Sequence, residues 1–296
     1  MLSRLNTVFL FLFFCFSHSA FSQIQVVAEQ DQDRNLTLIS FNKSPIPYTI
    51  RIEFQKLENL ESMEGRIIFA TANPGKSILT KLRSIYVNEK TGFQYNTQLF
   101  KGDFKLFTPN LPPYLIPIEK GKKLQMRPLT VQTSAQNATI YTGVGFFVEE
   151  KSTVCAPRKG IVSAIQMDKP IASTGPSNWE SENYVEIYHA DGTFSRVSGL
   201  APNSALVEVG DTVFPGQAIA SSSATSDQNV HLVKMIQSRW EMGDFKMEWV
   251  NFTVKIQTDS QLISTEQILE NVESNHPQEI ILLEMDKKEL KKYTGK

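Results

Sequence analysis

The chain has 296 residues, and its 30 lysines and arginines nearly balance its 31 aspartates and glutamates. This balance argues against a nucleic-acid-binding protein, which normally carries a basic excess. The length is enough for two domains. Of the two cysteines, Cys15 lies in the apolar N-terminal segment, so Cys155 has no partner for an internal disulfide once that segment is removed.

Residues 1–22 have the features of a signal peptide. Arg4 supplies a positive charge, residues 8–16 are apolar, and Ala20-Phe21-Ser22 resembles a cleavage site. The apolar run is shorter than the roughly 20 residues that span a bilayer. The sequence therefore predicts export to the periplasm or the extracellular space, and a mature chain without a transmembrane segment.

Residues 23–110 are predicted to form an immunoglobulin-like β-sandwich. The region contains short runs of β-branched and aromatic residues separated by turn signals. The clearest runs are residues 36–39, 48–54 and 66–69. Four prolines between residues 109 and 117 are incompatible with a central strand, so residues 111–139 are interpreted as a linker with lead-in strands.

A second β-rich domain is predicted over residues 140–260, and the whole protein is assigned to the all-β class. Its clearest expected strands are residues 161–165, 184–188 and 205–209. Residues 261–296 are expected to form a helical, charged tail. Ser264 is expected to cap a first helix that continues through Val272, and a second helix is expected over residues 279–293.

Three blocks in the second domain resemble the M23 family of zinc peptidases, the lysostaphin-like or LytM proteins. They are Cys-Ala-Pro-Arg-Lys-Gly-Ile-Val at 155–162, Asn-Tyr-Val-Glu-Ile-Tyr-His-Ala-Asp-Gly at 183–192, and the glycine-containing stretch at 207–219. The resemblance implies an antiparallel sheet of the duplicated-hybrid-motif type. It also implies cleavage of peptide cross-links in the bacterial cell wall.

The resemblance further implies where a zinc site would lie. The family's three ligands fall on Tyr141, Gly145 and Val233, and its two assisting histidines fall on Gly199 and His231. Glycine and valine have no ligating side-chain atom, and a phenol with a pKa near 10 is a poor zinc ligand at neutral pH. We therefore expect that zinc is lost, that no cofactor is bound and that no catalytic set is intact. His231 is vestigial, and the five positions are expected to line a binding groove.

A zinc site rebuilt from other residues is an alternative. Glu149, Glu150 and Cys155 lie near the former ligand positions, although Cys155 is expected to be buried. Two more histidines remain after the expected removal of residues 1–22, His189 in a hairpin turn and His276 in the tail, and both are expected at the surface.

The leading functional hypothesis is an exported, non-catalytic M23-like protein, a pseudoenzyme. It would bind a peptidoglycan peptide or a partner cell-wall hydrolase through the vestigial groove. One alternative is an active zinc endopeptidase with non-standard ligands. Another is a structural or interaction protein of the cell envelope.

Overall fold

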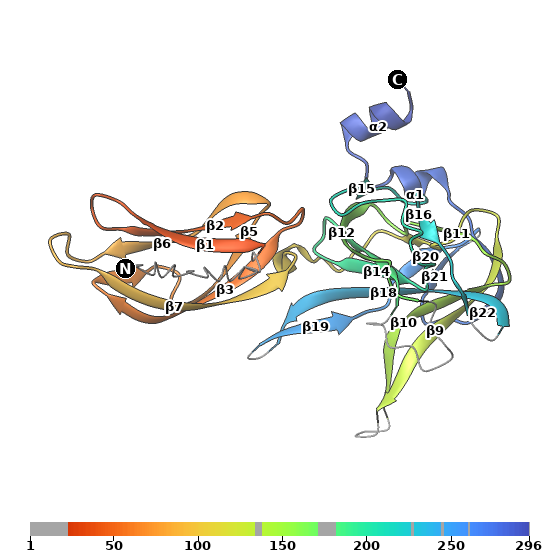
Figure 1. Cartoon of the computed structure of the whole chain (residues 1–296), viewed down its shortest axis with the longest axis horizontal. Coiled ribbons are helices and arrows are strands. Elements are labelled where there is room, and N and C mark those ends of the chain that lie inside the picture. The colour runs from red at the N-terminus through yellow and green to blue at the C-terminus, as the bar shows by residue number, and fades with distance from the viewer. Residues whose placement is uncertain are drawn as a thin grey trace, which may run out of the picture.

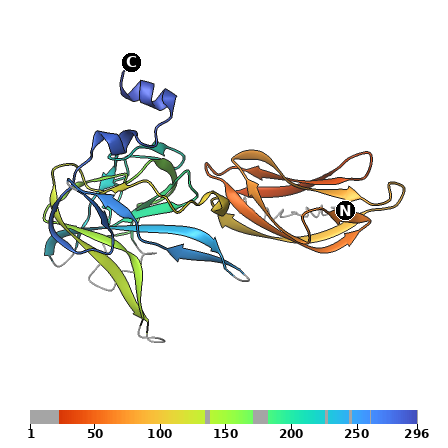
Figure 2. The ribbon, with the colours of Figure 1, turned by 180° about the vertical axis from the view of Figure 1, so that it is seen from behind.

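The computed structural model describes residues 23–133, 138–170, 182–225, 228–243, 246–259 and 261–295. The expected signal peptide at 1–22 lies outside these residues. Figures 1 and 2 show two β-rich domains lying end to end. In the described part of the chain, no helix is both long and apolar enough to cross a membrane.

The N-terminal domain is a sandwich of two antiparallel sheets, and the sequence prediction of strands here agrees with its all-β structure. The first sheet has the order β1 (Ile24–Gln30), β2 (Leu36–Asn42), β6 (Gly75–Ser84), β4 (Leu60–Ser62). The second has the order β5 (Ile67–Ala72), β3 (Tyr48–Glu58), β7 (Gly92–Lys101). Alternating residues such as Leu38, Ile50 and Ile52 are fully buried between the sheets, as expected for strands with one face in a core.

A ten-stranded sheet organises the second domain. Its main order is β15 (Thr212–Val213), β12 (Gly160–Gln166), β13 (Tyr184–Tyr188), β14 (Phe194–Ser198), β18 (Gln228–Met242), β10 (Ala138–Val148), β9 (Lys123–Thr133), β22 (Leu269–Glu273). Two further strands, β17 (Ala224–Thr225) and β19 (Met247–Asn251), pair with β18. The remaining strands form two small sheets, β11 (Thr153–Cys155) with β16 (Ala218–Ser221), and β21 (Leu262–Ser264), β20 (Lys255–Gln257), β8 (Tyr114–Leu115).

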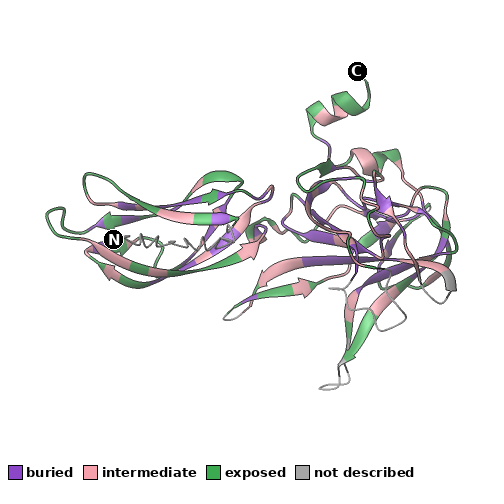
Figure 3. Cartoon of the chain, viewed as in Figure 1, coloured by how far each residue is buried: buried purple, intermediate pink, exposed green. Residues whose placement is uncertain are grey.

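The small sheets cover one face of the large sheet and enclose the main core. Val144 and Phe146 of β10 and Val233 and Met235 of β18 point into this core and are fully buried. Figure 3 shows the buried residues concentrated in the body of each domain, while the outer end of the hairpin of β9 and β10 is exposed. Because successive side chains of a strand alternate between faces, the neighbours of these core residues lie on the other face of the sheet.

The expected first helix of the tail is wrong. Residues 262–273 instead contribute β21 and β22, and Leu269 of β22 pairs with Met126 of β9. Ser264 Oγ accepts a hydrogen bond from Glu266 N at 3.2 Å, which forms a turn between the strands rather than a helix cap. Pairing with β9 and burial of Val272 against the core favour the extended conformation.

Helices occur only after that strand in the described tail. They are α1 (Gln278–Leu282) and α2 (Lys287–Tyr293). The tail is anchored by Glu284, which forms a bidentate ion pair with the buried guanidinium of Arg158 at 2.9 and 2.7 Å. The expectation of a short helical end therefore holds for this last segment.

The two domains meet at an apolar contact that is bordered by charges. Ile46 of the sandwich packs with Tyr188 and Phe194 of the second domain. Lys101, at the end of β7, forms an ion pair with the buried carboxylate of Glu186. The short 3-10 helix η1 (Phe104–Leu106) follows, and the chain then leads into β8.

Candidate functional site

The sequence-predicted site falls on three neighbouring strands, β14, β18 and β10. Lys234 in the middle of β18 lies opposite Gly145 of β10 on one side and opposite Ser198 of β14 on the other. Partners across an antiparallel pair project to the same face. Gly145, Lys234 and Ser198 therefore share the face that points away from the main core.

Val233 does not share that face. It lies opposite Phe146, and both side chains are fully buried in the core. A Cβ placed on Gly145 would instead lie 3.0 Å from Cδ1 of Leu232. The alternation along β18 thus brings Leu232 and Lys234 beside Gly145 and turns Val233 to the opposite side of the sheet, in contrast to the expected common groove.

Tyr141 is separated from Gly145 by an irregularity in β10. The register between β9 and β10 shifts between Tyr141 and Gly143, so simple alternation does not extend through this point. Burial raises the pKa of the Tyr141 hydroxyl to about 12. The phenol therefore stays protonated at neutral pH and offers no phenolate ligand.

His231 lies near the start of β18, and the partner of its imidazole is a hydroxyl group. It pairs with Val148 of β10, a core residue, and with Ala224 of β17. Its Nδ1 lies 3.0 Å from the hydroxyl of Ser222. His231 is thus on the core side of β18, away from the face that carries Lys234.

Gly199 is packed against the backbone of β18 and has no room for a side chain. Its φ of 79° lies in the left-handed region, which favours glycine. A Cβ at this position would stand 2.1 Å from the carbonyl oxygen of Leu232. The family histidine that aligns with Gly199 would require the backbone to move.

A buried ion pair occupies the face beside Gly145, and the sequence reasoning missed it. The Lys234 ammonium pairs with Glu182, and each side chain is only 7% exposed. The hydroxyl of Ser198 donates a hydrogen bond of 2.9 Å to the second oxygen of Glu182. A lysine within the apolar run Val230 to Ile236 is the sequence signal that could have drawn attention to this pair, because a buried lysine needs a partner.

The residues at the predicted positions do not fit a zinc ion. Gly145 and Gly199 have no donor, Val233 faces the core, Tyr141 is protonated, and His231 is a single imidazole. Across the described ranges, no group of three or more histidines, cysteines, aspartates or glutamates is arranged to hold a metal. In addition, the Lys234 ammonium would repel a divalent cation placed beside it.

The other two histidines are not where the sequence suggested. His189 is fully buried, with Nδ1 2.7 Å from Lys159 O and Nε2 2.7 Å from Ser195 Oγ. Burial and the nearby Arg158 lower the pKa of His189, so its imidazole is neutral. His276 is half-buried, and its ring packs against Gly216.

Cys155 is buried as expected. Burial raises the pKa of its thiol to about 12, so the thiolate that binds metals is not populated at neutral pH.

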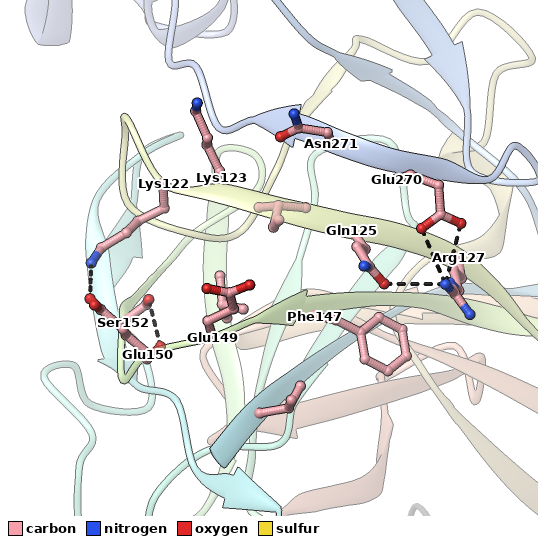
Figure 4. Close-up of a pocket in the computed structure, with 13 residues that line it drawn as sticks. Lys122, Lys123, Gln125, Arg127, Phe147, Glu149, Glu150, Ser152, Glu270 and Asn271 are labelled. Carbon is pink, nitrogen blue, oxygen red and sulfur yellow. Dashed lines mark hydrogen bonds and ion pairs between the residues drawn. The ribbon is translucent and has the colours of Figure 1, made fainter. Parts of the chain in front are cut away.

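The same face carries an open pocket of about 700 Å³ at the neighbouring ends of β9, β10 and β22. Figure 4 shows Phe147 and Glu149 on the β10 side, and Gln125 and Asn271 on the opposite side. Phe147 lies two residues after Gly145, so its ring adjoins the face described above. Sequence reasoning missed this pocket because its walls come from segments far apart in the chain.

Comparisons with known proteins give a family match that covers part of this sheet. Residues 139–243 match the model of peptidase family M23. No curated protein sequence matches the chain. Three solved structures are similar at low TM-scores, which do not by themselves establish a common fold.

The first is a SpoIIQ-SpoIIIAH pore-forming complex, with 18% identity over 44% of this chain and 85% of that chain and a TM-score of 0.30. The second is a putative peptidase M23 from Pseudomonas aeruginosa, with 15% identity over 64% of this chain and 82% of that chain and a TM-score of 0.26. The third is a zinc-containing peptidase from Vibrio cholerae, with 12% identity over 79% of this chain and 56% of that chain and a TM-score of 0.29.

The matched residues run from β10 through β18, the strands that carry the sequence-predicted positions. Residues 139–243 are therefore similar to peptidase family M23.

Proposed function

We propose that this protein is an exported, non-catalytic member of the M23 family that binds a cell-wall peptide or a partner cell-wall hydrolase. Binding would use the partly exposed residues of this sheet face, Leu232 and Phe147, which lie beside Gly145. A strand face and its neighbouring edges can hold an extended peptide without cleaving it.

The observation that carries this proposal is the buried Lys234–Glu182 pair next to Gly145. It places a fixed positive charge and a hydrogen-bonded carboxylate on the face where the family resemblance led us to expect an aspartate ligand. Hydrolysis by a metallopeptidase needs a metal that lowers the pKa of its bound water from 15.7 to about 7. In this arrangement the side chains around Gly145 supply no such ligand set.

Zinc content and peptidase activity test the loss of catalysis. The chain starting at Gln23 should carry well under one zinc per molecule after dialysis without chelator. It should not hydrolyse peptidoglycan or glycine-rich peptides, with or without added zinc. The His231→Ala variant is the control, and an activity that co-purifies with the parent and disappears in this variant contradicts the proposal.

Binding is tested separately by sedimentation with purified peptidoglycan and by capture of cell-wall hydrolases from the producing organism. The Leu232→Arg variant places a long charged side chain on the proposed face and should reduce binding at least fivefold. Ile78→Arg is the matched control, because Ile78 is 60% exposed on the sandwich domain. Equal binding by both variants would exclude this face, and no binding by the parent would favour a structural role in the envelope.

A further inference from the structure

The pocket in Figure 4 has balanced charges that are already partly paired. At one end Lys122 forms an ion pair with Glu150 at 3.2 Å. At the other end Arg127 binds both carboxylate oxygens of Glu270 at 3.2 Å. These two ion pairs mark the ends of the pocket, and the opposite charges neutralise each other within each pair.

Two oppositely charged residues that line the pocket, Lys123 and Glu149, have no ionic partner among the described residues. Lys123 comes from the start of β9, and Glu149 follows the end of β10. Both are exposed, and within the described contacts neither makes an ion pair or a side-chain hydrogen bond. Asn271 of β22 also lines the pocket without a hydrogen-bond partner there. A lysine, a glutamate and an asparagine without side-chain partners among the described residues therefore line one open pocket.

We propose that this pocket binds a small zwitterionic ligand, namely a short peptide with a free amino end and a free carboxyl end. Glu149 binds the ammonium of the peptide, and Lys123 binds its carboxylate. Charge-assisted hydrogen bonds of this kind are stronger than neutral ones. This inference rests on the proposed binding role and identifies where a peptide end is recognised.

The remaining walls suit the body of such a peptide. The Phe147 ring and Val230 offer apolar contact, while the Asn271 amide can donate to and accept from a peptide group. The volume of about 700 Å³ lies within the range of roughly 300–1,000 Å³ that is usual for small-ligand pockets. A ligand that is neutral overall matches a lining in which three basic and three acidic side chains balance.

The pocket belongs to this chain rather than to the family domain alone. Of the thirteen lining residues, six lie inside residues 139–243 and seven lie outside. Lys123 is among the outside residues, and so is Asn271, which is present because residues 269–273 form β22 instead of a helix. The strand that sequence analysis mistook for a helix thus builds one wall of the site.

Calorimetric titration with tetra-alanine tests the assignment, using the peptide with free ends, its N-acetylated form and its C-terminal amide. The parent protein should bind the free peptide at least tenfold more tightly than either blocked form. The Glu149→Gln variant should lose the preference for a free amino end and keep the preference for a free carboxyl end. The Lys123→Met variant should show the reverse pattern.

Matched controls are Glu61→Gln and Lys120→Met, two exposed positions outside the pocket, which should behave like the parent. Equal affinity of the parent for all three peptides, or no binding at millimolar concentration, overturns the inference. Neither result would alter zinc content or the absence of hydrolysis, so failure of this inference is distinguishable from failure of the proposed function.

Discussion

Lys234 illustrates how a charged side chain can be stable inside a sheet. Removing an ammonium group from water carries a large desolvation penalty, which is offset only by a close partner with satisfied hydrogen bonds. Glu182 provides that partner, and Ser198 satisfies its second oxygen. Each member of this cluster therefore depends on the others.

Replacing Lys234 by methionine should destabilise the protein by about 3–5 kcal/mol, because Glu182 would be left as an uncompensated buried charge. The free energy of unfolding from urea titration measures the effect. The double variant Lys234→Met with Glu182→Leu should recover most of the loss, since it removes both charges. A double variant as unstable as the sum of its single changes would show that the two residues do not act as a pair.

His189 should make stability depend on pH in a defined direction. Its pKa in the folded state is lowered below the usual 6.5 by burial and by Arg158, so only the unfolded chain takes up a proton as the pH falls below that value. The stability contribution is complete above about pH 6.5 and is lost on acidification. Between pH 7 and pH 5 the loss should be about 2 kcal/mol.

Urea titrations of the His189→Gln variant at pH 7 and pH 5 should show a loss of unfolding free energy that is smaller than in the parent by about 2 kcal/mol. His231→Gln is the control, since it leaves the His189 contribution in place. The pKa values of the Glu186 and Asp191 carboxyls are lowered, so these two groups take up protons in the folded state only at more acidic pH. An unchanged pH dependence in His189→Gln would assign the effect elsewhere.

At the scale of single elements, strand alternation could be predicted from sequence while the pairing between strands could not. The expected strands at residues 161–165 and 184–188 form parts of β12 and β13, whereas residues 205–209, also expected as a strand, form none. Whether Val233 or Lys234 lies beside Gly145 depends on the register of β10 and β18, which a motif alignment does not contain. The strand β22 was missed because its stability comes from β9, more than a hundred residues earlier.

The tail is held by two ion pairs, Arg158 with Glu284 and Lys159 with Glu289, and the more buried pair, Arg158 with Glu284, should contribute more. Glu284→Gln leaves Arg158, only 2% exposed, with Asp191 as its remaining ionic partner. We expect a loss of about 2 kcal/mol, the usual contribution of a hydrogen bond to a charged group. Urea unfolding measures the loss, and limited proteolysis should show faster cleavage after residue 277.

Glu279→Gln is the matched control for the tail, because Glu279 is exposed and should change stability by less than about 0.5 kcal/mol. If both variants behave alike, the tail is not held by Glu284.

At the scale of the whole molecule, the contact between domains should make them unfold together. Gly102 has a φ of 84°, and a Cβ there would stand 2.9 Å from the Phe194 ring of the other domain. Gly102→Val should therefore separate the domains, and calorimetry should resolve two transitions where the parent shows one. Gly65→Val is the control, since Gly65 has a similar φ of 91° but nothing within 4 Å. Two transitions already present in the parent would show that the domains are not coupled.

The close approach of Gly199 to the carbonyl oxygen of Leu232 also limits what can be engineered at this position. A histidine introduced by a single codon change at position 199 would collide with that oxygen at its first side-chain atom. Its benefit could appear only after the turn between β14 and Leu200 had been rebuilt. Engineering a family-like centre at this position must therefore begin with the backbone of this turn rather than with the ligands.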